Sequence, residues 1–309
     1  MVKRICLAMA TSTVLATQSL GLNLSTTQAN QNWSKYAGGN HILFVSGREG
    51  GGYHTIGSNA VKILKTYAKS YATGKSINID VATTDGSAQN LSLILEQNKA
   101  NIGLTQVDVL LNFLDKNPQY AKNIAIYPLE KYKERLMCIV KKDDGIDEGD
   151  WQDEDNIVKI GINSYASGTA KTLEIMNKLE PKFKNSKMIE TGNYENGIQD
   201  LKSGYIDTYC MMTGADASSK LFKSVDKDKA LTFMTITDWD LDDNMVLNVN
   251  GKDEKISNYK RVKVDINTGF FKDKIKTIET EVAIIVLRKK DENTRIINRA
   301  IETILQNNK

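Results

Sequence analysis

The feature that most constrains this chain is a repeated order of an apolar run, a short polar or glycine-containing segment and an amphipathic run. Four such segments occur, at residues 46–53, 84–90, 106–108 and 164–169. Each follows a run typical of a buried strand and precedes residues spaced for a helix. Alternating strands and helices predict a parallel sheet built from βαβ units. Since ligands bind beyond the carboxyl ends of strands in such sheets, we expect the four segments to face one small molecule.

The first 29 residues have the pattern of a secretory signal peptide. Lys3 and Arg4 precede an apolar stretch at residues 5–24, and Thr27-Gln28-Ala29 places small side chains at the −3 and −1 positions of a cleavage site. A membrane anchor is the alternative, but this stretch contains too many hydroxyl and amide side chains for a good span. We therefore expect export of a mature protein to the periplasm.

The composition limits the kinds of molecule that the protein is expected to bind. The chain is 40% hydrophobic and 26% charged, as expected for a globular protein. Its formal net charge falls from +3 to +1 without residues 1–29, because this segment carries two basic and no acidic residues. A nearly neutral mature chain does not indicate nucleic-acid binding.

The strand and helix patterns divide the chain into two similar blocks. The first contains strand patterns at 41–45, 77–81, 101–104 and 124–127 and helix patterns at 54–70, 88–96 and 108–114. The second contains strand patterns at 158–162, 188–191 and 206–211 and helix patterns at 168–179 and 194–202. Later strand patterns occupy 231–236, 261–264 and 282–287, and a helix pattern closes the chain at 291–305. We expect lobe 1 to comprise residues 30–135 plus about 285–309, lobe 2 to comprise 136–284, and the chain to cross between them near 135–141.

Two cysteines remain after the signal peptide, Cys138 and Cys210, each within an apolar strand-like run. Export permits a disulfide. Sequence alone does not place their Cα atoms within the short span that a disulfide needs, so we expect two buried thiols that behave as small hydrophobic side chains.

No metal site is indicated. The acidic segment 143–155 is expected to be a solvated loop, because an EF-type loop with Gly149 at its sixth position would place Ile146 at the third. His41 and His54 have no cysteine nearby, so zinc is not expected. An oxygen-rich group also lacks a glycine at the position that a calcium loop requires: Asp238, Asp240, Asp242 and Asp243.

The first and last of the four segments are suited to an anion. Gly50-Gly51-Gly52-Tyr53 opens a helix, where glycines let backbone N–H groups approach a ligand. It is neither a P-loop nor a dinucleotide fingerprint. Ser167-Gly168-Thr169 can either cap the next helix or hold a carboxylate with its amides and hydroxyls. Thr84 and Ser87 offer the same geometry, Gln106 is expected to point into the cleft, and Asp108 to cap the helix that it begins.

These segments resemble a known family, the TAXI class of extracytoplasmic solute-binding proteins that serve TRAP-type transporters. The matching motifs, in order, are Ser46–Gly57, Thr84-Asp85-Gly86-Ser87-Ala88-Gln89-Asn90-Leu91, Gln106-Val107-Asp108, Ser167-Gly168-Thr169 and Gly204-Tyr205-Ile206-Asp207. His54 and Thr55 replace the family's usual Tyr-Pro, and Arg48-Glu49 brings charge into a loop that is normally neutral. The likeness extends from about residue 42 to 216 and is loose beyond.

The resemblance implies a two-lobed α/β fold of the type II periplasmic-binding-protein kind, with the ligand between the lobes. It implies a receptor, not an enzyme, that binds a small carboxylate such as glutamate or 2-oxoglutarate and delivers it to a TRAP-type membrane permease. No cofactor is implied, and we expect a monomer. The residues expected to bind the ligand are Arg48, Gly51, Gly52, Tyr53, Thr84, Ser87, Asn90, Gln106, Ser167, Gly168 and Thr169.

Individual roles follow from the side chains. Tyr53 would cover the ligand, hydroxyls and glycine amides would donate to its carboxylate oxygens, and Gln106 would contact a polar substituent. Arg48 can pair with a second ligand carboxylate, with Glu49, or with another surface group. Two other classes stay open: an exported enzyme on the same architecture, although no nucleophile-elbow spacing is present, and a surface protein with a degenerate site.

Overall fold

The computed structural model describes residues 40–71, 76–143, 145–237, 244–249, 252–257, 259–268 and 273–308. The expected signal peptide lies outside these residues, as does the aspartate group at 238–243. None of the described helices combines the length and apolar character needed to cross a membrane.

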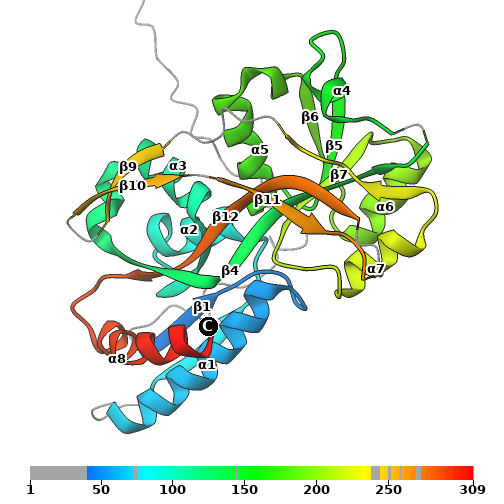
Figure 1. Cartoon of the computed structure of the whole chain (residues 1–309). Coiled ribbons are helices and arrows are strands. Elements are labelled where there is room, and N and C mark those ends of the chain that lie inside the picture. Colours follow the sequence, from blue (N-terminus) through cyan, green and yellow to red (C-terminus); the bar gives the residue numbers. More distant parts are fainter. Residues whose placement is uncertain are drawn as a thin grey trace, which may run out of the picture.

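The first lobe is a sheet covered by helices on both faces, and its first three strands are parallel (Figure 1). Its strands β1 (His41–Val45), β2 (Asn78–Ala82) and β3 (Ile102–Gln106) pair in the order β2-β1-β3. Alternate residues of β1 face opposite layers: Ile42 and Phe44 pack against α1 (Gly52–Tyr71) and α8 (Glu292–Asn307), whereas Leu43 and Val45 pack on the other side. That other side consists of α2 (Ser87–Leu91), the π-helical turn Ser92–Glu96, α3 (Val107–Lys116) and the short helix Pro118–Asn123.

The second lobe repeats this plan. Its strands β5 (Val158–Ile162), β6 (Ser186–Glu190) and β7 (Thr208–Thr213) are parallel, and β8 (Leu231–Phe233) pairs with β4. Its helices are α4 (Glu148–Gln152), α5 (Gly168–Leu179), Pro181–Lys184, α6 (Tyr194–Ser203) and α7 (Lys220–Lys227). A separate hairpin, β9 (Asn244–Val249) and β10 (Lys252–Ser257), is followed by β11 (Lys260–Asp265).

Two long antiparallel strands join the lobes. β4 (Ile124–Lys141) and β12 (Lys274–Leu287) pair with each other and extend from one lobe into the other (Figure 1). The predicted strands 124–127 and 282–287 are therefore only the lobe 1 ends of longer strands. The middle of β4 was missed because Glu130–Arg135 is rich in charged residues and lacks the run of apolar side chains that marks a buried strand.

The hydrophobic clusters show where the chain crosses. Leu129 packs in the core of lobe 1 and Leu136 in that of lobe 2. On the return strand, Ile278 belongs to lobe 2 and Val282 to lobe 1. We place the two crossings within these intervals, where the pairing of β4 with β12 is also irregular between Glu281 and Ala283. The full strand order β2-β1-β3-β12-β4-β7-β5-β6 agrees with the expected two-lobed α/β fold.

The acidic segment 143–155 is not simply a solvated loop, as the sequence analysis expected. It contains α4, and the Asp147 carboxylate caps this helix by accepting hydrogen bonds from the amides of Gly149 (2.7 Å) and Asp150 (3.1 Å). The helix presents Trp151 to the core of lobe 2, where its ring is fully buried against Phe183. Acidic residues in the first turn stabilise a helix N-terminus, so the charge that suggested a loop instead favours this helix.

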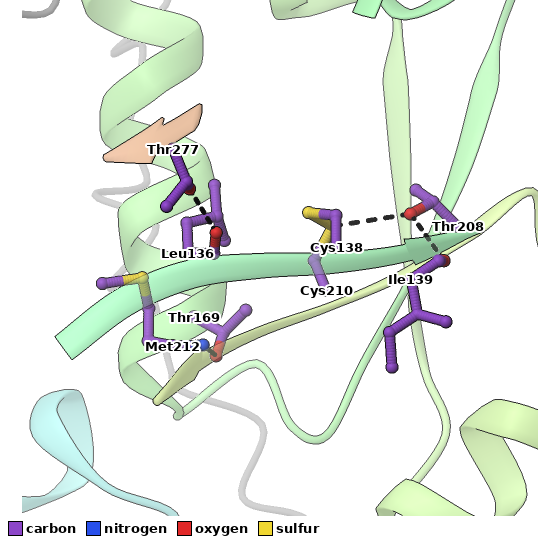
Figure 2. The surroundings of a disulfide bond; sticks show 8 residues. All are labelled: Leu136, Cys138, Ile139, Thr169, Thr208, Cys210, Met212 and Thr277. Carbon is purple, nitrogen blue, oxygen red and sulfur yellow. Dashed lines mark hydrogen bonds between the residues drawn. A yellow bond between two sulfur atoms is a disulfide. The ribbon is translucent and has the colours of Figure 1, made fainter. Parts of the chain in front are cut away.

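Cys138 and Cys210 form a disulfide, which corrects the expectation of free thiols (Figure 2). The two residues are direct partners in the antiparallel pairing of β4 with β7, with 4.1 Å between their Cα atoms. This register places both side chains in the core of lobe 2 on the face covered by α5. The pairing is a consequence of strand register over a separation of 72 residues, which no local pattern specifies.

Candidate ligand-binding site

A cavity of about 190 Å³ lies between the two lobes. Its lobe 1 and crossing-strand residues are Gly47, Arg48, Gly51, Gly52, Tyr53, Asp85, Gly86, Ser87, Gln106, Tyr132 and Glu134. Its lobe 2 residues are Asn163, Ser167, Gly168, Thr169, Met212 and Thr213. The cavity is smaller than the pockets of several hundred Å³ that hold drug-sized molecules, so it is suited to a small ligand.

Helix N-termini from both lobes meet at this cavity. The 20-residue helix α1 begins at Gly52 and the 12-residue helix α5 begins at Gly168. Gly50 lies at φ 78°, which glycine adopts without strain, and lets the chain turn into α1. The first amides of a helix have no acceptor within the helix and carry its positive dipole end. Both helix ends therefore favour an anionic group in the cavity.

Close backbone approach explains two of the glycines. A Cβ at Gly52 would overlap the hydroxyl of Tyr132, and a Cβ at Gly168 would overlap Oε1 of Gln106. The second contact joins lobe 2 to lobe 1. Any side chain at Gly168 would therefore hold the two lobes apart or displace Gln106.

Tyr53, Ser87 and Gln106 form one hydrogen-bonded group within lobe 1. The Ser87 hydroxyl lies 3.3 Å from the Tyr53 hydroxyl. It donates to Oε1 of the Gln106 side chain (3.2 Å) and accepts from the backbone amide of Gln106 (3.1 Å). Gln106 Nε2 donates across the cleft to Thr172 (3.2 Å). Gln106 thus points into the cleft as expected, and it also links the lobes.

Thr84 and Asn90 do not line the cavity, although both were expected to bind the ligand. The Thr84 hydroxyl donates to the Ser46 carbonyl (3.0 Å) or to Oδ1 of Asn90 (2.7 Å). Nδ2 of Asn90 donates to the carbonyls of Ser46 (2.5 Å) and Leu104 (2.7 Å). Both side chains are fully buried. Their polar groups hold the first and second loops onto the sheet, which is a structural role.

Ser167 and Thr169 have different surroundings. Ser167 caps α5 by accepting from the Ala170 amide (3.2 Å), and its hydroxyl donates to the Ser164 carbonyl (2.6 Å). Thr169 Oγ1 accepts a hydrogen bond from the Met212 amide (2.9 Å), as Figure 2 shows. A hydroxyl that accepts can still donate its own proton. Thr169 is therefore better suited than Ser167 to donate to a ligand.

Arg48 closes one side of the cavity. Its guanidinium forms an ion pair with Asp85 (2.9 Å) in lobe 1 and donates to the Gly192 carbonyl in lobe 2. The Asp85 side chain is only 2% exposed, so this pair is partly shielded from water. Of the three roles weighed for Arg48, the structure places it in a pair with another protein group, and Glu49 is not that partner.

The sequence analysis missed Tyr132 and Glu134, which reach the cavity from β4. Glu134 is 8% exposed and accepts a hydrogen bond from the Tyr132 hydroxyl (3.4 Å). Burial, together with the negative charge of Asp108, raises the pKa of Glu134 from 4.5 to about 8. Burial also raises the pKa of Tyr53 and of Tyr132, so both phenols keep their protons. Asn163 directly follows β5, and Met212 lies near the carboxyl end of β7. The rule that ligands bind at the carboxyl ends of strands could have identified both.

Asp108 does not cap α3, contrary to expectation, because Gln106 occupies the N-cap position. Its buried carboxylate instead accepts hydrogen bonds from two residues of lobe 2, Thr172 (2.6 Å) and Tyr259 (3.0 Å). Burial raises its pKa to about 6, and these hydrogen bonds act in the opposite direction. Gln106 and Asp108, two residues apart, therefore both bind Thr172 across the cleft.

Comparison with known protein families shows that one family model matches most of the chain. The model of the NMT1-like family matches residues 44–307. No curated protein matches the chain.

Solved structures with a similar fold are remote in sequence. The substrate-binding protein of an amino acid ABC transporter is 14% identical, with a TM-score of 0.43 over 86% of this chain and 94% of that one. AbpA from Streptococcus pneumoniae, bound to L-arginine, is 14% identical, with a TM-score of 0.42 over 87% and 90%. The GluR0 ligand-binding core from Nostoc punctiforme, in complex with L-glutamate, is 12% identical, with a TM-score of 0.44 over 86% and 93%. At these identities the likeness concerns the fold alone.

Proposed function

The chain belongs to the NMT1-like family, and we propose that it is an extracytoplasmic receptor whose lobes close over a small organic anion. The observation that carries this proposal is the cavity of about 190 Å³ between the lobes, into which the N-termini of α1 and α5 open. Two helix ends from separate lobes supply unpaired amides and positive potential at one place, which suits a carboxylate.

The donors nearest to such a carboxylate are backbone and hydroxyl groups. The amide of Gly52 lies at the start of α1, and those of Gly168 and Thr169 lie at the start of α5. The amide of Gly51, which was also expected to bind the ligand, already donates to the Arg48 carbonyl (3.0 Å). The Thr169 hydroxyl adds a side-chain donor. Tyr53 and Gln106, which share the Ser87 hydroxyl, would contact the rest of the ligand. Thr84, Asn90 and Ser167 support these loops and have no direct role in this proposal.

Closure of the lobes is part of the proposal. Across the cleft, Gln106 donates a hydrogen bond to Thr172, the Asp108 carboxylate accepts one from Thr172, and Arg48 donates one to the Gly192 carbonyl. The connection between the lobes consists of β4 and β12, whose crossings are short. Two strands that join two lobes form a hinge that can bend while each lobe stays rigid. We therefore propose that ligand binding favours this closed arrangement over an open one.

The compartment and the partner extend the same proposal. Disulfides persist in oxidising compartments, so the Cys138–Cys210 bridge supports export in addition to the N-terminal signal pattern. The motif order supports assignment to the TAXI class, with a TRAP-type membrane permease as the partner and a monomeric receptor. The carboxylate would then be released to the permease when the lobes open.

The decisive experiment is mass spectrometry of ligand retained by the mature protein purified under native conditions. A thermal-shift screen of small carboxylates follows, since ligand bound to the folded state raises the unfolding temperature. We expect at least one small organic anion to bind with micromolar or tighter affinity and to be recovered without chemical change. Conversion of the bound ligand would favour an exported enzyme. Failure to bind any small anion, with none retained, would favour a surface protein with a degenerate site.

A further inference from the structure

The cavity contains a carboxyl group that the proposed anion site does not explain. On β4, successive side chains point to opposite faces of the strand. Lys133 and Arg135 lie on the face where they pair with carboxylates of β12: Lys133 with Glu281 (2.6 Å) and Arg135 with Glu279 (2.9 Å). Glu134 points to the other face, where it lines the cavity. Over residues 133–135 the strand therefore directs its two bases outward and its acid, Glu134, toward the cavity.

Glu134 has no cationic partner among the described residues. It is more than nine-tenths buried, and the groups that hydrogen-bond to it are the hydroxyls of Tyr132 (3.4 Å) and Tyr53. The titratable groups that act on it are Tyr53 from α1, Tyr132 from its own strand and Asp108 from α3. None of these three can supply a positive charge. Arg48, the basic side chain that lines the same cavity, pairs with Asp85.

A buried carboxyl group beside a bound anion is unfavourable unless it stays protonated or gains a cation. The same small cavity also presents the positive ends of α1 and α5. A ligand that carries a carboxylate and an ammonium group satisfies both features, with the carboxylate at the helix ends and the ammonium at Glu134. A ligand with carboxylates alone satisfies only the first.

We propose that Glu134 determines the ligand preference of the cavity, by selecting a ligand that carries an N–H cation beside its carboxylate over the corresponding 2-oxo acid. The class of ligand is then an amino acid. This inference rests on the proposed receptor function. It concerns which anion the cavity accepts, and the receptor proposal can be correct without it.

The test compares matched pairs that differ only at the α-substituent. Isothermal titration calorimetry on the mature protein would use L-glutamate with 2-oxoglutarate, L-alanine with pyruvate, and L-leucine with 4-methyl-2-oxopentanoate. We expect the amino acid to bind at least tenfold more tightly in every pair that gives measurable binding. In Glu134→Gln, the affinity for the amino acid should fall at least tenfold, because a hydrogen bond to a charged group is replaced by a neutral one. The affinity for the 2-oxo acid should change less than about threefold.

Proton release provides a second readout. Since the pKa of Glu134 is raised in the empty cavity, a cation bound beside it should displace up to one proton at pH 7. Titrations in two buffers of different ionisation enthalpy measure that number, and Glu134→Gln should abolish it. Glu302→Gln is the matched control: Glu302 lies on α8, away from the two crossing strands, is exposed and does not line the cavity. It should bind like the wild type.

Three results overturn the inference. The first is tighter binding of the 2-oxo acid in each pair. The second is unchanged amino acid affinity in a folded Glu134→Gln protein. The third is no binding of any amino acid while other carboxylates bind, and this result leaves the receptor proposal standing. If no carboxylate of either kind binds and none is retained on purification, both proposals fail.

Discussion

Removing the Cys138–Cys210 disulfide should destabilise lobe 2 substantially. The bridge closes a loop across a separation of 72 residues. For a loop of this length, the chain-entropy relation gives a stabilisation of about 4 kcal/mol relative to the open chain. Both sulfurs lie in the core on the α5 face of lobe 2, so replacement by alanine also loses a little packing. The double variant Cys138→Ala/Cys210→Ala should therefore lose about 4 kcal/mol or slightly more.

Urea denaturation measures this loss, with the fluorescence of Trp151 as the probe in a protein whose other two tryptophans, Trp33 and Trp239, are replaced by phenylalanine. Trp151 is fully buried in the same cluster as the two cysteines, so its signal reports unfolding of the lobe that contains the bridge. The wild-type protein, oxidised and after reduction by dithiothreitol, is the control, and the reduced form should resemble the double variant. A loss below about 1 kcal/mol would refute the reasoning, because it would mean that the bridge restricts the unfolded chain far less than its loop length implies.

Three further predictions concern the cavity. Replacing Thr169 by valine should weaken ligand binding about tenfold, and it should lower the free energy of unfolding by roughly 1 kcal/mol because the Met212 amide loses its acceptor. Ligand titration measures the first effect and urea denaturation the second. The control Thr169→Ser keeps the hydroxyl and should bind normally. Gly168→Ala should lower the affinity for the ligand at least tenfold, because the added Cβ would overlap Gln106 of the other lobe. Small-angle scattering should show that the variant stays more open than the wild type with ligand present. Normal closure of the variant would contradict a contact between the lobes at Gly168. The third concerns pH. The pKa of Glu134 is raised from 4.5 to about 8, so its contribution to stability is complete below pH 4.5 and is lost as pH rises to 8. Denaturation at pH 5 and pH 8 should show a decrease of a few kcal/mol that Glu134→Gln reduces, and an equal pH dependence in the variant would exclude Glu134 as its source.

The four loops were predictable because they combine two local signals. Each follows a strand and begins a helix with residues that suit a helix start. Three of the preceding strands, β1, β3 and β5, are buried on both faces, whereas β2 exposes Asn78 and Asp80. The strand 158–162 and the helix 168–179 were predicted with the bounds that the structure has. The hairpin of β9 and β10 was missed, although Asn250-Gly251 between the two strands is the strongest short signal of such a turn.

Resemblance to a family motif did not show which residues line the cavity and which only hold the loops in place. Thr84 and Asn90 belong to the same motif as Ser87, yet they hold loops together below the cavity while Ser87 lines it. Whether a hydroxyl faces the cavity or binds a backbone carbonyl depends on which segment of the folded protein lies opposite it. That neighbour is often distant in sequence: the Asn90 side chain binds the carbonyl of Ser46, 44 residues earlier.

By itself, the sequence determined most of the helices and strands of the two lobes and the loops that meet at the cleft, because these depend on residue periodicity and on backbone preferences within a few positions. Export stays a prediction from the N-terminal pattern. The tertiary structure alone decided the disulfide and the position of Glu134 in the cavity. The disulfide requires that β4 and β7 pair with Cys138 opposite Cys210. Glu134 reaches the cavity because β4 continues from one lobe to the other, so that Tyr132 and Glu134 line the cavity while Glu130 and Lys131 are exposed. Both outcomes depend on contacts between segments far apart in the chain, which local sequence does not encode.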